Sequence, residues 1–152
     1  MYQALEQMGV HPDTVLEPAM GVGNFFGLMP ESMQNATLMG VELDSITGRL
    51  AKQLYPQANI TVDGFERVNL PDNSIDLAVG NVPFGSYKLA DPRYDKQNLL
   101  IHDYFFVKTL DKVRPGGIVA FITSKGTLDK QDSTVREYLA QRADLLGAVR
   151  LP

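Results

Sequence analysis

Short apolar segments alternate with amphipathic segments along most of the chain. Apolar runs of about four to eight residues between turn residues are typical of buried strands, and apolar residues at helical spacing are typical of helices. The runs predict strands at 14–17, 36–43, 59–62, 75–79 and 118–123, with a further strand beginning in 145–151. The helical spacings predict helices at 2–8, from 24 onward, and at 45–54, 99–112 and 133–141. This alternation predicts an α/β fold with a doubly wound, mostly parallel sheet.

The remaining segments are polar or rich in turn residues. Residues 85–98 lack periodicity, so we expect a mobile loop there. Pro115–Gly117 is expected to form a turn, and 126–132 a loop. In open sheets of this kind, ligands bind beyond the carboxyl ends of the strands, where the strand order reverses. The loop at 18–23, after the first predicted strand, should therefore contact a cofactor.

The length and composition fit one globular domain of 152 residues, with 44% hydrophobic and 21% charged residues. The apolar runs are too short to span a bilayer, and the N-terminal residues lack the basic and apolar regions of a signal peptide. The absence of cysteine excludes disulfides and Cys-ligated metals and suits a cytoplasmic protein. His11 and His102 are not spaced with acidic residues as metal ligands are, so we predict no metal site.

Two glycines suggest where a ligand binds. Gly21 and Gly23 lie between a predicted strand and a predicted helix, where they let the backbone turn sharply and approach a ligand closely. A glycine-rich turn that only links the two elements would explain them equally well. Glu42 ends the second predicted strand 19 residues after Gly23 (42 − 23). An acid about 20 residues after such a loop is placed to bind ribose hydroxyls, so this order of residues favours a ribosyl ligand.

The charge and spacing around this loop distinguish between ribosyl ligands. The dinucleotide fingerprint needs a third glycine at a fixed spacing, and Gly27 falls one residue too late for it. Glu17 beside the loop would repel a pyrophosphate and attract an ammonium group. S-adenosylmethionine carries an ammonium and a sulfonium and no phosphate, so it is the predicted cofactor. A nicotinamide-dependent oxidoreductase is correspondingly disfavoured.

Residues 17–25 (EPAMGVGNF) resemble the first motif of class I methyltransferases, in the form found in DNA enzymes that methylate amino groups. The resemblance implies that Glu17 and the backbone of 19–23 hold the methionine end of the cofactor, and that Glu42 holds the ribose. It also implies that Asp63 contacts the adenine amine and Phe65 the adenine face, although a plain turn would explain Asp63-Gly64 as well. The implied cofactor-binding residues are Glu17, Pro18, Ala19, Gly21, Gly23, Asn24, Glu42, Asp63, Gly64 and Phe65.

Residues 80–85 (GNVPFG) resemble the Asn-Pro-Pro-Tyr/Phe motif that follows the fourth strand in enzymes that methylate exocyclic amines. Such an amine is a poor nucleophile because its lone pair is delocalised into the ring. The Asn81 side chain and the carbonyl of Val82 could each accept one amine hydrogen and aim the lone pair at the methyl group. Phe84 could stack on the base, which is worth ~1–3 kcal/mol. The implied catalytic residues are Asn81, Val82, Pro83 and Phe84, with Val82 standing where the family usually has proline.

The resemblance therefore predicts an adenine-N6 DNA methyltransferase acting on an extruded or single-stranded base. A protein-glutamine or RNA-guanine methyltransferase is an alternative, because both use related motifs. A non-catalytic module of a larger DNA-processing protein is another, favoured by Val82. The net charge of −4 lacks the basic surplus of a module that grips DNA alone, so additional domains are expected to contribute DNA binding. The oligomeric state is left open.

The resemblance extends from 14 to 152. Class I methyltransferases complete their sheet with a strand pair, and this sequence ends where that pair should begin. We therefore expect one catalytic domain, truncated before the strand pair and excised from a longer protein. The order of Asn81, residues 91–94 and residues 124–126 is similar to the methylase region of large methylase–helicase proteins of bacterial mobile elements and phages. We expect the excised piece to bind cofactor weakly and to methylate little.

Several further residues are assigned structural roles. His102 is expected to be a packing or surface histidine, and Tyr104, Phe105 and Phe106 are expected to lie in the core because they follow helical spacing. The charges of the 85–98 loop are expected to be solvated, at Lys88, Arg93 and Lys96.

Overall fold

The computed structural model describes residues 1–151 and contains one five-stranded sheet in the order β3-β2-β1-β4-β5. All of its strand pairs are parallel. The strands are β1 (Thr14–Glu17), β2 (Thr37–Glu42), β3 (Asn59–Val62), β4 (Ile75–Asn81) and β5 (Val113–Ile122). Since the chain builds outward from β1 to β3 and then returns to add β4 and β5, the strand order reverses between β1 and β4. The predicted doubly wound α/β fold is confirmed.

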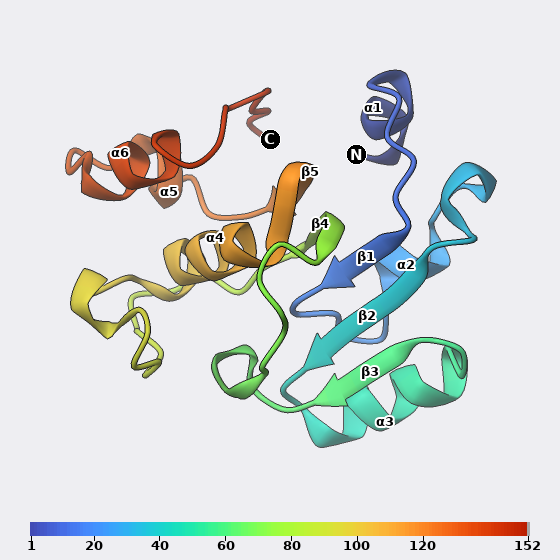
Figure 1. The fold of residues 1–152 in the computed structure, drawn as a ribbon. Coiled ribbons are helices and arrows are strands. Elements are labelled where there is room, and N and C mark those ends of the chain that lie inside the picture. Colours follow the sequence, from blue (N-terminus) through green and yellow to red (C-terminus); the bar gives the residue numbers. More distant parts are fainter. Residues whose placement is uncertain (152) are drawn as a thin grey trace.

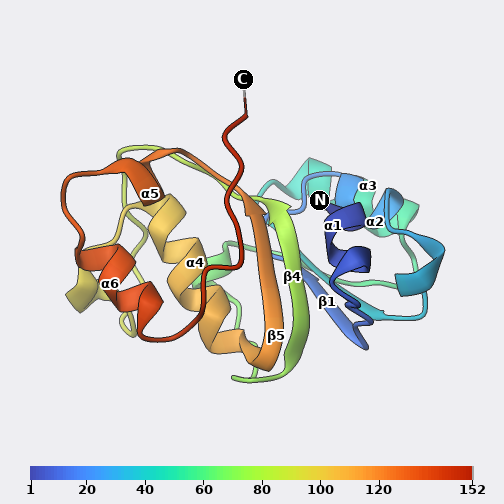
Figure 2. The same ribbon diagram turned by 90° about the horizontal axis from the view of Figure 1, so that it is seen from above.

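Helices cover both faces of this sheet. They are α1 (Tyr2–Gln7), α2 (Asn24–Gly27), α3 (Ser45–Leu54), α4 (Ile101–Lys112), α5 (Gly126–Asp129) and α6 (Thr134–Ala140), with single-turn 3₁₀ helices at Glu31–Met33, Phe65–Arg67 and Asp95–Gln97. Figure 2 shows α1, α2 and α3 on one side of the strands and α4, α5 and α6 on the other. The molecule is therefore a three-layer sandwich. None of the helices within residues 1–151 is both long and apolar enough to cross a membrane.

The sequence explains why α3 packs so closely against the sheet. Asp44 caps its N-terminus, where the carboxylate accepts a hydrogen bond of 2.7 Å from the backbone N of Thr47. The buried side of the helix carries Gly48 and Ala51, whose small size allows a close approach. A Cβ at Gly48 would lie 2.7 Å from a methyl group of Val62 on β3. This close packing holds α3 against β2 and β3, the two strands at one edge of the sheet.

The core divides at the sheet because neighbouring strand residues point to opposite faces. Val15, Leu77 and Val79 pack on the α1–α3 side, whereas Leu16 and Ala78 pack on the α4 side. All five side chains are fully buried. A central parallel strand is covered on both faces and so reads as a continuous apolar run, which is why β1 and β4 were visible in the sequence.

Three predictions about the C-terminal part were wrong. The predicted loop at 126–132 begins with a short helix, α5, at Gly126–Asp129. No strand forms in 145–151: this segment makes no strand pairing in the described part of the chain, and Leu145 and Val149 are 73% and 86% exposed. An apolar run becomes a strand only where a neighbouring strand pairs with it. The predicted turn at Pro115–Gly117 instead lies inside β5 as a bulge, because Ile75 pairs with Val113 and Leu77 already pairs with Ile118. Gly116, at φ +81°, supplies the backbone geometry that this bulge needs.

Candidate functional site

The predicted site residues gather at the carboxyl ends of β1, β2 and β4, on both sides of the reversal in strand order. β1 ends at Glu17, β2 at Glu42 and β4 at Asn81. Figure 1 shows the arrowheads of β1 and β2 at the same edge of the sheet. β4 brings its end to Glu17 directly, since a Cβ placed on Gly80 would lie 3.6 Å from Cγ of Glu17. The buried Gly80 therefore places the end of β4 against Glu17.

The loop between β1 and α2 has the backbone geometry that the glycines predicted. Gly21 and Gly23 adopt φ values of +56° and +86°, in the left-handed region that side chains disfavour. At Gly23 the space is filled as well, because a Cβ there would lie 2.5 Å from the ring of Tyr55. The Tyr55 hydroxyl also donates to the Gly23 carbonyl over 2.8 Å. The loop is therefore held in one shape by α3 and its C-terminal tyrosine.

Glu42 binds the glycine loop directly. Its Oε2 accepts a hydrogen bond of 2.7 Å from the backbone N of Gly21, and its Oε1 accepts one of 2.8 Å from the backbone N of Asp44. A carboxylate offers about four acceptor positions, so these two bonds leave capacity for the hydroxyls of a ribose. Glu42 thus has a structural role that the sequence did not reveal, beside the ligand-binding role that remains a prediction.

Glu17 is the most unusual group at this edge. It is 2% exposed, and its Oε2 has no hydrogen-bond partner among the residues described. Burial, and then the nearby charge of Glu42, raise the pKa of Glu17 to about 8. A buried carboxyl without a partner is unfavourable unless a ligand completes its surroundings. An ammonium group placed beside it would supply both the missing donor and the missing positive charge, so the donor set fits the amino-acid end of S-adenosylmethionine.

The motif after β4 combines anchored and exposed residues. Asn81 is exposed and pairs with Ile122 across the β4–β5 ladder. Val82 is 1% exposed, and its backbone N donates to the Ile122 carbonyl over 3.0 Å. The side chain of Phe84 is 60% exposed. Val82 therefore fixes the segment to β5, while the side chains of Asn81 and Phe84 are exposed beyond the carboxyl end of β4.

Comparison with known proteins supports a likeness in both sequence and structure. No protein-family model matches the chain. It is 30% identical to Defense against restriction protein B of Escherichia phage P1, over 158 residues that cover 100% of this chain and 7% of that protein. It is 27% identical to Modification methylase CviBIII of Paramecium bursaria Chlorella virus NC1A, over 114 residues that cover 72% of this chain and 30% of that protein.

Among solved structures, one match is a Listeria monocytogenes protein assigned to the class I S-adenosylmethionine-dependent methyltransferases, with a TM-score of 0.64 and 18% identity. This match covers 84% of the chain described here and 44% of the other. The chain has the class I methyltransferase fold. It spans less than a third of the length of each of the two viral relatives, as the shares of 7% and 30% show.

The loop after β3 follows the carboxyl end of the strand next to β2, at the same edge of the sheet as Glu17 and Glu42. The Asp63 carboxylate accepts hydrogen bonds from the backbone N of Gly64 over 2.8 Å and from Nε of Arg67 over 2.5 Å. The hydrogen bond from Arg67 holds the pKa of Asp63 below its ordinary value, so the carboxylate is ionised. The ring of Phe65 is 3% exposed and packs in the core, with its centroid 5.1 Å from that of Phe105. The resemblance assigned Phe65 to the adenine face, and the structure shows it covered by core side chains.

The segment after the motif was predicted to be a mobile loop, and it is anchored instead, although its cationic side chains are exposed as predicted at Lys88, Arg93 and Lys96. Asp91 is 7% exposed and accepts hydrogen bonds from Tyr104 and Lys108 of α4. Tyr94 donates over 2.6 Å to Asp111, which also pairs with Arg93. The sequence did contain a signal for this network. Tyr104, Lys108 and Asp111 are polar residues at positions i, i+4 and i+7 of a largely buried helix.

The predictions of core positions on α4 are confirmed for two of the three aromatic residues. Tyr104 and Phe105 are buried as predicted, whereas Phe106 is half-buried and packs edge-on against Phe121. His102 is buried, and neither ring nitrogen has a hydrogen-bond partner among residues 1–151. Within the same residues, no three His, Asp or Glu side chains gather as metal ligands would.

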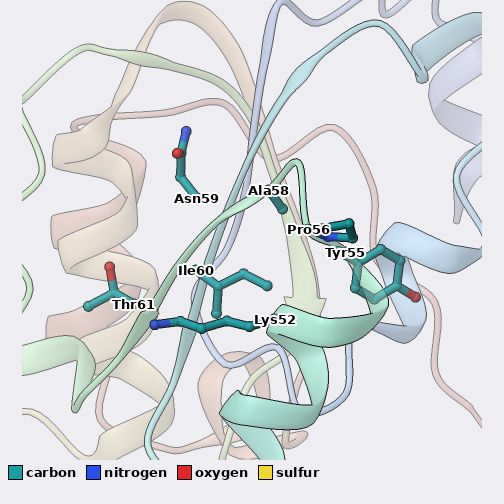
Figure 3. Close-up of a pocket in the computed structure, with 7 residues that line it drawn as sticks. All are labelled: Lys52, Tyr55, Pro56, Ala58, Asn59, Ile60 and Thr61. Carbon is teal, nitrogen blue, oxygen red and sulfur yellow. The ribbon is translucent and has the colours of Figure 1, made fainter.

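A separate hollow lies between the end of α3 and β3 (Figure 3). It is lined by Lys52, Tyr55, Pro56, Ala58, Asn59, Ile60 and Thr61. It extends to Asn59, the first residue of β3, and it contains none of the predicted site residues. The carboxyl edge of the sheet, and not this hollow, is therefore the candidate site.

Proposed function

We propose that the chain binds S-adenosylmethionine at the carboxyl ends of β1 and β2 and serves to methylate the N6 amine of adenine in DNA. The observation that carries this proposal is the buried, unpartnered carboxyl of Glu17, which lies beside the glycine loop and against Gly80 at the end of β4. This arrangement supports a cationic ligand on one side and a reacting group at Asn81 on the other.

Each of these residues has a distinct role in the proposed complex. Glu17 accepts hydrogen bonds from the ligand ammonium, and the shaped backbone at Gly21 and Gly23 lets the ligand approach closely. Glu42 keeps the glycine loop in place and binds the ribose through its remaining acceptor capacity. When bound, S-adenosylmethionine supplies a methyl group made electrophilic by the positive sulfur.

The residues after β4 hold the adenine amine. The side-chain oxygen of Asn81 and the backbone carbonyl of Val82 each accept one amine hydrogen, which draws the nitrogen toward tetrahedral geometry. Phe84 stacks on the base from its exposed position. Asn81 needs no basic partner, because the nitrogen keeps both protons until it has been methylated, and the cationic product then releases one proton to water. Proximity and orientation then account for most of the rate enhancement.

DNA is the proposed substrate for two reasons. The motif at 81–84 is of the type that acts on exocyclic amines, and the two viral relatives are named for restriction defence and for modification. With a net charge of −4 the chain offers little general attraction for phosphates. We therefore propose that further segments contribute most of the DNA affinity and that the isolated chain turns over slowly.

A labelling experiment tests the proposal and separates its alternatives. The chain is incubated with methyl-labelled S-adenosylmethionine and equal masses of single-stranded DNA, duplex DNA, RNA and protein, and the products are hydrolysed and separated by mass. N6-methyladenine from DNA is expected with the natural sequence and is lost with Asn81→Ala. Asn81 is exposed, so this variant should fold and still bind cofactor. Label in glutamine or guanine would replace the DNA proposal, and cofactor binding without any transfer would indicate a non-catalytic module.

A further inference from the structure

Lys108 binds two segments that are far apart in the sequence. Its ammonium is buried on α4, with the residue 4% exposed. It donates to the backbone carbonyls of Phe65 and Glu66, over 2.8 and 3.3 Å, in the loop after β3. It also donates over 3.1 Å to the carboxylate of Asp91, in the segment that follows the Asn81 motif. A buried ammonium must have its hydrogen bonds satisfied, so these three acceptors fix its position.

Asp91 is equally well fixed. Besides Lys108, it accepts hydrogen bonds from the Tyr104 hydroxyl over 2.6 Å and from the backbone N of Arg93 over 3.1 Å. Burial acts to raise the pKa of Asp91, but the hydrogen bonds from Tyr104 and Lys108 outweigh burial and hold the pKa below its ordinary value. Asp91 is therefore ionised, and its pairing with Lys108 is a buried ion pair whose two members belong to different segments.

The aromatic packing strengthens the connection. The ammonium of Lys108 lies 5.0 Å from the ring centroid of Phe65, which in turn packs against Tyr104 and Phe105. The backbone and the side chain of Phe65 thus both depend on α4. If either member of the ion pair is altered, the support of the loop after β3 changes even when the alteration lies beyond β4.

We propose that Lys108 and Asp91 are positioning residues that couple the 63–67 loop to the 87–98 segment. Resting on the proposed function, this makes the affinity for the adenosine part of the cofactor depend on a contact on the target-base side of the site. Neither residue needs to touch cofactor or substrate. Through this coupling, binding of a base near the 87–98 segment would change the affinity of the 63–67 loop for the cofactor, and the reverse.

Tyr94 offers a matched control. It belongs to the same segment as Asp91, and its hydroxyl is bonded to the same helix through Asp111 over 2.6 Å. Among the described residues that bond reaches α4 and not the loop after β3. Tyr94→Phe therefore loosens the 87–98 segment while leaving the connection through Lys108 in place.

The test compares Asp91→Asn, the double variant Asp91→Asn with Lys108→Met, and Tyr94→Phe. The double variant avoids leaving one buried charge unpaired, and Asp91→Asn keeps an acceptor for Tyr104 if the double variant fails to fold. Hydrogen exchange is followed in peptides covering 63–68 and 87–98. We expect all three variants to exchange faster in 87–98. Only the Asp91 variants should also exchange faster in 63–68, by about tenfold for the double variant. The coupling is overturned if Tyr94→Phe speeds exchange in 63–68 as much as the double variant does. It is also overturned if exchange in 63–68 is unchanged in the Asp91 variants.

Calorimetric titration with S-adenosylhomocysteine supplies the second measurement. The double variant should bind about tenfold more weakly and Tyr94→Phe within about twofold of the natural sequence. Unchanged affinity in the double variant overturns the claim that the coupling reaches the cofactor. If the natural sequence itself does not bind, the proposed function fails, whereas the exchange data still decide whether the two loops are coupled.

Discussion

Raising the pH from 6 to 8 should strengthen the binding of S-adenosylmethionine, because binding requires Glu17 to be ionised. The pKa of this carboxyl is raised to about 8 by burial and by the charge of Glu42. If only the ionised form binds the ammonium, the ionised fraction rises from roughly 1% at pH 6 to about half at pH 8. The affinity measured relative to Glu17→Gln should therefore rise by about 50-fold over this range.

The assay is calorimetric titration at several pH values in buffers that differ in ionisation enthalpy. Near pH 7 the natural sequence should release close to one proton per ligand bound, and Glu17→Gln should release less because its amide does not titrate. The amine of the ligand titrates identically in both experiments, so the ratio of the two affinities isolates Glu17. The reasoning is refuted if the pH profile of the natural sequence has the same slope as that of Glu17→Gln.

The same carboxyl should affect the stability of the unliganded chain in the opposite sense. Its folded pKa lies above the unfolded value, so the folded chain binds an additional proton between about pH 4.5 and 8. The free energy of unfolding should therefore decrease as the pH rises through this window. Glu17→Gln removes the effect and should stabilise the unliganded chain at pH 8 by an amount on the order of a few kcal/mol. At pH 5, urea titrations of the two proteins should nearly coincide.

Three substitutions test the rest of the framework. Gly23→Ala forces a side chain into a left-handed position against the Tyr55 ring, so we expect a lower Tm and weaker cofactor binding, measured by thermal shift with and without ligand. Val82→Pro restores the residue of the family motif but removes the N–H that bonds to Ile122, so it should lower the Tm and leave kcat no higher. Leu77→Ala empties a fully buried position in β4 and should reduce the free energy of unfolding in urea by about 2–5 kcal/mol, with m unchanged.

Three elements could be predicted closely from the sequence because their residues follow strand or helical spacing between turn residues. β1 at 14–17, β3 at 59–62 and α3 at 45–54 have the predicted bounds. The failures occurred where local pattern and tertiary pairing disagree. The apolar residues of 145–151 have the composition of a strand but pair with nothing among the described residues, and glycine with proline in 115–117 marks a bulge within a strand.

The gathering of the predicted site residues followed from the sequence more readily than their contacts did. The structure brings Gly21, Gly23 and Glu42 together at one edge of the sheet, as their order along the predicted fold implied. The contact between Glu42 and Gly21 could not be predicted, because it depends on the register of β1 against β2. The pairing of Asp91 with Lys108 was missed because polarity along 85–98 resembles that of a solvated loop. Only the tertiary contact with α4 distinguishes the two cases.

Two buried carboxyl groups, Asp91 and Glu17, differ in their surroundings, and this difference supports the proposed placement of the site. Asp91 is surrounded by donors and needs nothing further, so its interactions stabilise the fold. Glu17 is at least as buried and has one oxygen without a donor. His102 also lacks partners, but a neutral imidazole is far less costly to bury than a carboxylate. Among these groups, only Glu17 combines a carboxyl that burial makes unfavourable to ionise with a position beside the glycine loop at the strand-order reversal. An apolar residue at this position would stabilise the unliganded chain more, which is why we propose that a cationic ligand completes the surroundings of this carboxyl.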